Sequence, residues 1–463
     1  MTVARTPAVL ETLLAALRAR VSGPVLTATD DLQPYRRDRA ADPGAGTPLA
    51  VVRAQSVTDV QAVIELAAAH GVAVIPRGAG SGLSGGASAV DGAVVLSVED
   101  MREIAVDPVT MTATAGPGVL NAELKAAAAQ HGLWYPPDPA SFEFCSIGGN
   151  VATNAGGLCC VKYGVTRDYV LGMTVVLADG SVVELGGRLI KDVAGLPLMQ
   201  LFIGSEGTLG VIVSVTVRLR AAPPPSSTLL VTFDDIDAAG EVVVALARTG
   251  RLSMLELMDR TTVECVEHEH RGGLDTGACA TLIVQSDEPG EAGAATIAES
   301  AAICTRGGAI TVSQARTAAE GQHWAQLRRG AIPSVEAAAG SLLLGDVGVP
   351  LPSLGRLMVG IEEIAREAGV PIALIAHAGD GNTHPLVMRD TSSAESIARA
   401  DAAYGRVMDL AIALDGTITG EHGVGRLKRP WLAANVGSDV VRLNQVVKTA
   451  LDPQGILNPG AGF

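Results

Sequence analysis

The amino-acid sequence predicts an α+β protein built from more than one domain, and three observations lead to this fold class. The chain has 463 residues, about three times the ~150 residues of an average domain. Hydrophobic residues make up 48% of it and charged residues 18%, a balance that excludes a disordered chain. From about residue 48, short apolar segments alternate with segments of helical periodicity, as expected for packed helices and sheets.

Patterns along the first half of the chain define its elements in order. Four leucines in residues 10–17 recur at helical spacing, which predicts an amphipathic helix rather than a signal peptide. Ser56 and Gly71 flank a periodic apolar segment and predict the start and the stop of a second helix. Short β-rich segments predict strands at 72–76, 93–98, 173–179, 181–187 and 209–219.

A proline-rich segment, 221–227, indicates a domain boundary. Beyond it, a second α/β region extends to about residue 390 and a helical tail follows. We therefore predict a first domain of residues 1–222, a second of 223–391 and a helical C-terminal segment of 392–463.

Charge and cysteine content exclude several classes of function. The formal net charge is −15, whereas a general binder of nucleic acid or anionic lipid needs a basic surface. The six cysteines include no C-x-x-C pair, so neither an iron–sulfur cluster nor a thiol-redox site is indicated, and a reducing cytoplasm suits the chain. Apolar stretches such as 370–376 end well before the ~18 residues of a membrane span. We therefore expect no nucleic-acid partner and no transmembrane segment.

A glycine-rich loop follows the strand predicted to end at Pro76. Gly80, Gly82 and Gly85 match the G-x-G-x-x-G pattern of a dinucleotide site. A Rossmann site requires this loop to open a helix, whereas residues 84–91 are small and turn-forming. We instead expect backbone N–H groups of the loop to form a concave nest for a pyrophosphate. A tight strand connection without a ligand is the open alternative.

A second run of small residues, 145–157, is rich in Gly, Ala, Ser and Asn and follows the segment Pro136–Pro139. This composition does not favour a core helix. We interpret the run as backbone that lies against a large, flat ligand. Because two such runs occur in one chain, this interpretation also favours a ligand at the glycine-rich loop.

Three of the eight histidines lie in residues 377–422. His377 and His384 are joined by a Gly-Asp-Gly-Asn turn, so we expect them at facing ends of adjacent strands, with Cβ atoms ~4.5–5.5 Å apart. Glu421 and His422, flanked by glycines, are the third element. Two histidines and one carboxylate form an open catalytic site for zinc, manganese or ferrous iron. Taken by themselves, these residues fit equally well a second interpretation, in which they are hydrogen-bonded polar side chains at strand ends that hold no metal.

Taken together, these motifs resemble a known family. The chain contains, in this order, the segments PRGAGSGLSGG, PPDP, CSIGGNVATNAGG, KYG and GSEGTLGVI and, near its end, DPQGILNPG. With these segments it looks like the FAD-linked D-2-hydroxyacid dehydrogenases of the vanillyl-alcohol-oxidase superfamily. This family includes D-lactate, D-2-hydroxyglutarate and glycolate oxidoreductases. The resemblance covers almost the whole chain from about residue 48. It implies a FAD-binding domain of two α/β subdomains, an α/β substrate domain or cap, and a helical C-terminal segment that returns to the flavin.

The resemblance also implies which residues hold the cofactors. Some members of the superfamily bind FAD covalently through a loop histidine, but residues 76–91 contain no histidine, so we expect non-covalent FAD. The implied metal ligands are His377, His384 and Glu421, with zinc as the expected ion and His422 as the general base. The implied FAD contacts are Pro76, Arg77, Gly78, Ala79, Gly80, Ser81, Gly82, Pro137, Asp138, Cys145, Ser146, Gly148, Gly149, Asn150, Ala152, Thr153, Gly156, Tyr163, Glu206, Gly207, Gly210, Ile212 and Asn458.

The predicted substrate end departs from part of the family. Arg328, with Arg329 as the alternative, matches the arginine that meets the substrate carboxylate. Members specific for hydroxyglutarate hold a second carboxylate with hydroxyl, lysine and asparagine side chains. In this chain the corresponding positions are apolar: Ile332 or Pro333, Leu344 and Leu386. A second carboxylate buried against these side chains would be poorly paired, at a cost of several kcal/mol.

We therefore expect oxidation of a D-lactate-like 2-hydroxy acid, with one carboxylate and an apolar tail, to the 2-oxo acid, with hydride passing to flavin N5. Because no Fe–S motif supplies an internal relay, we expect an external electron acceptor: an electron-transfer flavoprotein, a quinone or a cytochrome. The expected location is the cytoplasm, or the membrane periphery through that acceptor, and a homodimer is one option for the assembly. D-2-hydroxyglutarate or glycolate oxidation, FAD-dependent alkyl transfer and zinc hydrolysis are the alternatives.

Overall fold

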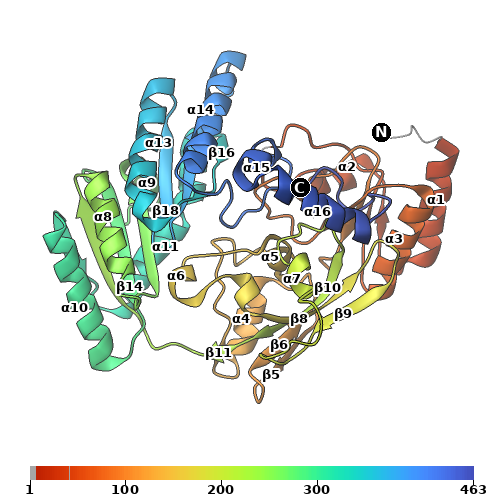
Figure 1. The fold of residues 1–463 in the computed structure, drawn as a ribbon, viewed down its shortest axis with the longest axis horizontal. Helices are drawn as coiled ribbons and strands as arrows, with labels where there is room; N and C mark the ends of the chain where they lie inside the picture. Colours follow the sequence, from red (N-terminus) through yellow and green to blue (C-terminus); the bar gives the residue numbers. More distant parts are fainter. Residues whose placement is uncertain (1–6, 41) are drawn as a thin grey trace.

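The structure, a computed structural model, describes residues 7–40 and 42–463. An N-terminal part with two main sheets lies beside a cap with one large sheet, and the C-terminal helices extend from the cap onto the N-terminal part (Figure 1). The predicted α+β class is confirmed. Within the described ranges, no helix is long and apolar enough to cross a membrane.

The first sheet of the N-terminal part carries the glycine-rich loop. Its strand order is β1-β2-β4-β3, and β2, β4 and β3 run parallel. As predicted, Ser56 caps the start of α3 by accepting a hydrogen bond from the Asp59 N–H, and Gly71 ends this helix at φ 61°. The elements are α1 (Pro7–Arg20), β1 (Val25–Leu26), α2 (Thr29–Leu32), η1 (Gln33–Tyr35), β2 (Ala50–Arg53), α3 (Val57–His70), β3 (Val74–Arg77) and β4 (Val94–Ser97).

The second sheet is antiparallel, in the order β5-β6-β10-β8-β9, and a two-stranded ribbon of β7 and β11 lies apart from it. The elements are β5 (Ile104–Asp107), β6 (Thr112–Ala115), α4 (Asn121–Ala129), β7 (Leu133–Trp134), α5 (Ile147–Thr153), α6 (Cys160–Tyr163), η2 (Thr166–Asp168), β8 (Val170–Val176), β9 (Val182–Gly186), α7 (Met199–Phe202), β10 (Val211–Arg218) and β11 (Arg220–Ala221).

The expectation that the run 145–157 avoids a core helix is wrong in part, because residues 147–153 form the short helix α5. Ile147 and Val151 are fully buried in the core of the second sheet. At Gly148, a Cβ atom would lie 2.6 Å from Pro117 Cβ, so glycine lets the helix approach the neighbouring chain. These tertiary contacts, rather than intrinsic helix propensity, stabilise α5.

The cap is an eight-stranded sheet in the order β15-β12-β14-β13-β18-β19-β16, with β17 paired to β19. Helices α8, α10 and α13 pack against one face, and α9 and α11 pack against the other. The elements are β12 (Ser227–Phe233), α8 (Ile236–Ala247), β13 (Met254–Asp259), α9 (Arg260–His270), β14 (Ala280–Ser286), α10 (Gly290–Arg306), β15 (Thr311–Gln314), α11 (Ala318–Arg329), α12 (Ala331–Ala339), β16 (Leu342–Leu344), β17 (Val347–Gly348), η3 (Leu351–Ser353), α13 (Leu354–Ala368), β18 (Ile372–His377) and β19 (Asn382–Met388).

The predicted hairpin that carries two histidines is present as β18 and β19, but its register differs from the expectation. His384 is paired with Ile375, and His377 is paired with Asn382. Residues 375 and 377 lie on the same face because side chains alternate along a strand. The two histidines are therefore diagonal neighbours on one face, not directly opposite each other.

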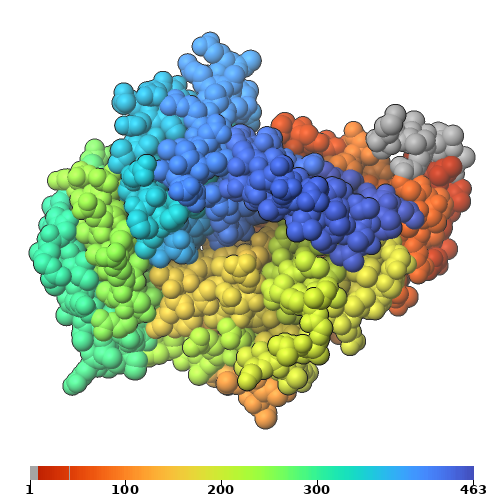
Figure 2. Space-filling view, in the orientation of Figure 1, coloured from red at the N-terminus to blue at the C-terminus, as the bar shows by residue number. Residues whose placement is uncertain are grey.

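The C-terminal segment joins the cap to the N-terminal part. Its elements are α14 (Ala394–Ala413), α15 (Arg429–Val436) and α16 (Ser438–Leu451). Helix α14 contributes to the cap core, whereas Val447 and Leu451 of α16 pack against the core of the second sheet. Figure 2 shows this segment, in blue, lying across the N-terminal part beside the cap. The loop between α14 and α15, which carries Glu421 and His422, is thereby held between the two bodies.

Candidate active site

One large pocket lies between the N-terminal part and the cap. Its walls include the loop after β3 and α5 on one side and Arg328, His377 and His422 on the other. Its empty space of about 1660 Å³ includes solvent at its open mouth. Because the lining runs from the glycine-rich loop to the histidines of the cap, a cofactor at the loop and a substrate at the histidines would lie in the same space.

Most of the predicted FAD contacts line this pocket. At Gly78 a Cβ would lie 2.3 Å from Ser146 Oγ, so this loop reaches α5 only because the position is glycine. The Ser146 hydroxyl accepts a hydrogen bond from the Ala79 N–H at 3.2 Å, which ties the loop to α5. The loop and α5 therefore form one continuous wall of the pocket, along which their backbone could contact FAD. The predicted contacts that line the pocket are Pro76, Arg77, Gly78, Ala79, Gly80, Ser81, Gly82, Cys145, Ser146, Gly148, Gly149, Asn150, Ala152, Thr153, Glu206, Gly207, Gly210 and Ile212.

The structure does not bring the other predicted FAD contacts to the pocket wall. Asp138 forms an ion pair with Arg329 at 2.7 Å, and the preceding Pro137 accepts a hydrogen bond from Asn121. Tyr163 donates a hydrogen bond to Asp287. Asn458 donates hydrogen bonds to the carbonyls of Gly86 and Glu206, both at 2.7 Å. Gly156 lies on the far side of Glu421, where a Cβ would be 2.5 Å from the carboxylate.

Glu206 has a second role beyond its place in the pocket wall. Its carboxylate accepts hydrogen bonds from the N–H groups of Val424 and Gly425, at 2.9 and 2.8 Å. Burial raises the pKa of this carboxyl to about 7. The segment next to the FAD loop thus holds the turn that immediately follows His422.

The predicted metal ligands converge at the end of the β18–β19 hairpin. Glu421 Oε1 lies 3.2 Å from His377 Nε2 and 3.2 Å from His384 Nε2. The second nitrogen of His377 lies 2.9 Å from Glu256, and that of His384 lies 3.3 Å from the Gly345 carbonyl. Metal-binding histidines characteristically have such partners on the other ring nitrogen. Two oriented imidazoles and a carboxylate fit a divalent cation.

Charge within this cluster is strongly coupled. Burial favours the neutral imidazole of His377, but Glu256 and Glu421 outweigh burial and hold its pKa well above the usual value. Burial likewise opposes ionisation of Glu421, but the histidines hold its pKa well below the usual value. Arg328 and a protonated His377 supply the positive charge beside these two buried carboxylates.

Asp346 positions the loop that carries Glu421 and His422. This fully buried carboxylate accepts hydrogen bonds from the His422 N–H at 2.9 Å and from the Thr419 hydroxyl at 2.7 Å. Lys428 Nζ lies 3.0 Å from it. Asp346, His384 and His422 are also close enough to hold a metal, but the ammonium group and the N–H donors already engage this carboxylate. We therefore assign it to positioning.

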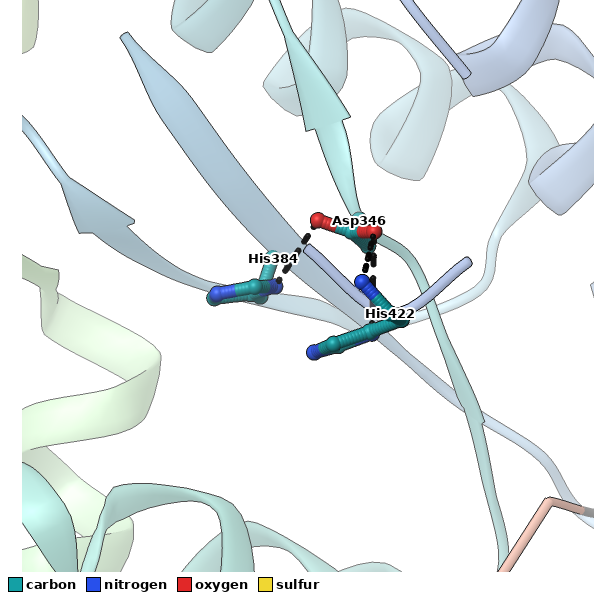
Figure 3. Close-up of side chains that lie close together, drawn as sticks. All are labelled: Asp346, His384 and His422. Carbon is teal, nitrogen blue, oxygen red and sulfur yellow. Dashed lines mark hydrogen bonds and ion pairs between the residues drawn. The ribbon is translucent and has the colours of Figure 1, made fainter. Parts of the chain in front are cut away.

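The imidazole of His422 lies beside Asp346 and stacks on His384. The two rings lie in nearly parallel planes (Figure 3). Their centroids are 4.7 Å apart, and the angle between their planes is 10°. Burial lowers the pKa of His422 to about 4, so the ring is neutral near pH 7. Among the described residues, its Nδ1 has no hydrogen-bond partner. A neutral imidazole in this pocket is able to accept a proton from a ligand.

The two candidate substrate arginines have different partners. Arg329 is bound to Asp138. Arg328 is 2% exposed and forms an ion pair with Glu256 at 2.7 Å, but its Nε is buried without a hydrogen-bond partner in the described chain. An unmade buried hydrogen bond costs ~1–3 kcal/mol, which a bound anion would offset. This geometry favours Arg328 over Arg329 for binding a carboxylate.

Sequence reasoning missed Glu256 and Lys428. Glu256 interrupts an apolar segment, Met254–Met258, and a charged residue within a buried strand is a signal that could have been used. Lys428 carries no comparable local signal, because its partner Asp346 is distant in the sequence.

Replacing Lys428 by methionine is expected to lower the free energy of unfolding by ~3–5 kcal/mol, because Asp346 would remain buried and charged without its counter-ion. Urea unfolding followed by circular dichroism measures the change. The control is Lys191→Met, since Lys191 is exposed. A change within the ~0.5 kcal/mol typical of surface substitutions would contradict this role of Lys428.

Both main parts of the chain match known family models. Residues 48–186 match the family model described as FAD binding domain, so the protein is of the FAD-dependent oxidoreductase class. Residues 222–461 match the model described as FAD linked oxidases, C-terminal domain. The chain belongs to the family of FAD-linked oxidases.

Curated relatives match nearly the whole chain. The glycolate oxidase subunit GlcD of Bacillus subtilis is 37% identical over 90% of this chain and 89% of that protein. A D-2-hydroxyglutarate dehydrogenase of Xanthomonas citri is 34% identical over 94% of this chain and 93% of that protein. A D-lactate dehydrogenase of Archaeoglobus fulgidus is 34% identical over 90% of this chain and 92% of that protein. The predicted family resemblance is confirmed.

Solved structures confirm the predicted fold. Substrate-bound p-cresol methylhydroxylase superimposes with a TM-score of 0.84 at 18% identity, covering 99% of this chain and 97% of that one. An alkyldihydroxyacetonephosphate synthase gives a TM-score of 0.76 at 18% identity, covering 98% and 86%. At this identity the likeness concerns the fold alone.

Proposed function

We propose that the protein oxidises a D-2-hydroxy acid with one carboxylate and an apolar tail to the corresponding 2-oxo acid. The proposal depends on one observation: Arg328, His422 and the cluster of His377, His384 and Glu421 line the same pocket as the glycine-rich loop. An anion-binding group, a base and a cation site thus face the FAD-binding wall. The names of the relatives, which refer to glycolate, D-lactate and D-2-hydroxyglutarate, support this reaction class.

Each of these side chains has a separate task. Arg328 binds the substrate carboxylate through its unpaired N–H, and the neutral imidazole of His422 accepts the proton of the C2 hydroxyl. Asp346 and Lys428 keep the His422 loop in place. A divalent cation held by His377, His384 and Glu421 would polarise the substrate hydroxyl. Bound FAD would supply the two-electron oxidant; an external acceptor would then reoxidise it.

The apolar end of the substrate is inferred from side chains near Arg328. Ile332 and Pro333 line the pocket. The other two predicted positions lie outside its wall, since Leu386 is fully buried among apolar residues and Leu344 lines a neighbouring pocket. A second carboxylate placed against these groups would be buried without a partner. This argues for a monocarboxylate over 2-hydroxyglutarate.

When each acid is mixed anaerobically with the protein, D-lactate and longer D-2-hydroxy acids are expected to bleach the flavin absorbance with a second-order rate constant at least tenfold higher than that of D-2-hydroxyglutarate. One unpaired buried charge costs more than the 1.4 kcal/mol that corresponds to a factor of ten. The L-enantiomers serve as controls. A preference for D-2-hydroxyglutarate would exclude the monocarboxylate assignment. The absence of bleaching by every 2-hydroxy acid would exclude the proposed reaction.

Acid precipitation of the purified protein is expected to leave the yellow flavin in the supernatant, because residues 76–91 offer no histidine for a covalent bond. Absorbance of the supernatant and of the redissolved pellet measures the distribution. Flavin retained by the washed pellet would show a covalent link.

A further inference from the structure

A second pocket lies beside the catalytic pocket, among β16, α12, α14 and α15. Its empty space of about 1000 Å³ includes solvent at its open mouth. Arg39, Leu83 and Ile332 line both pockets, so the two spaces share a wall of side chains. Ile332 follows Arg328 by four residues, which places the shared wall close to the proposed carboxylate-binding group.

The lining of the second pocket is apolar and aromatic. All three leucines of β16 line it, Leu342 and Leu344 from one face of the strand and Leu343 from the other. Tyr404 and Trp431 also line it, in an edge-to-face pair with centroids 6.0 Å apart. Aromatic and aliphatic groups of this kind bury apolar ligands.

The charges around the second pocket compensate one another. Arg39 pairs with Glu336 at 3.3 Å, and Arg389 lies 3.7 Å from Asp401. Each arginine that lines the pocket therefore faces a carboxylate that also lines it. Such a pocket suits an uncharged chain or ring and gives no net attraction to a second carboxylate.

We infer that this second pocket receives the tail of the substrate and makes the protein selective for D-2-hydroxy acids with long alkyl or aryl groups over D-lactate. The inference rests on the proposed function, because the tail enters only when the carboxylate is bound at Arg328. It follows from the shared wall at Ile332, the apolar lining and the paired charges. Leu342, Leu343 and Trp431 line the second pocket but not the catalytic one, so they determine selectivity without contacting the reacting atoms.

The test compares a series of D-2-hydroxy acids, from D-lactate to D-2-hydroxyoctanoate, with D-phenyllactate added. Each CH₂ that enters the pocket is expected to raise kcat/KM about fourfold, the equivalent of ~0.8 kcal/mol. In Leu343→Trp, the added ring fills the pocket. The gain with chain length is expected to disappear, whereas kcat/KM for D-lactate stays within twofold of wild type.

Leu196→Trp is the matched control, because Leu196 is 79% exposed. Leu342→Trp repeats the test if Leu343→Trp loses its flavin, and an unchanged D-lactate rate shows that either variant is folded. A flat chain-length series in the wild type, or a gain that persists in the folded variants, would overturn the inference while D-lactate oxidation leaves the proposed function intact. If no acid in the series reduces the flavin, the proposed function itself fails.

Discussion

A His422→Ala variant is expected to reduce its flavin about 10²- to 10⁴-fold more slowly than wild type, the range contributed by a positioned general base. In the structure, His422 is held by Asp346 through its backbone N–H and its ring is neutral near pH 7. Its alanine replacement removes the proton acceptor but leaves the glycine-rich loop unchanged. Anaerobic stopped-flow absorbance with D-lactate measures the rate.

The same variant must keep its FAD for the result to be informative. Its visible spectrum is expected to match that of wild type, since the pocket wall formed by the loop after β3 is unaltered. His323→Ala is the control because His323 is exposed. Wild-type reduction kinetics in His422→Ala would exclude His422 as the base.

Removing His384 is expected to abolish stoichiometric binding of a divalent cation and to lower kcat/KM by about 10³-fold or more. A cation that polarises an oxygen contributes several kcal/mol to the transition state, and each 1.4 kcal/mol is a factor of ten. Elemental analysis of the purified His384→Ala variant measures binding independently of activity. Prolonged dialysis of wild type against a chelator should give the same loss, and added zinc or manganese should restore it.

Glu256→Gln provides a graded version of this test. Because Glu256 orients His377 without joining the ligand set, its replacement is expected to weaken metal affinity by about 10- to 100-fold rather than abolish binding. His268→Ala, at an exposed position, is the control. A full complement of metal in His384→Ala would contradict the assigned ligand set.

Local sequence patterns predicted many of the elements that surround the site. The start and stop of α3 were predictable because the Ser56 cap and Gly71 act within one helical turn. The β18–β19 hairpin was predictable because its turn residues separate two apolar strands. The register of that hairpin was not, since pairing depends on how the whole sheet packs, and α5 was missed because its stability comes from contacts outside the helix.

The sequence alone predicted the family, the glycine-rich loop and the candidate ligands His377, His384 and Glu421, because short motifs carry each of them. Tertiary structure alone brought Glu256 beside His377 and Arg328, and brought Lys428 beside Asp346. It also formed the second pocket from β16 and the C-terminal helices. The physical reason is that a buried charge or an apolar wall is completed by a partner distant in the sequence. The packing within the cap, and of the cap against the C-terminal segment, determines which partner that is.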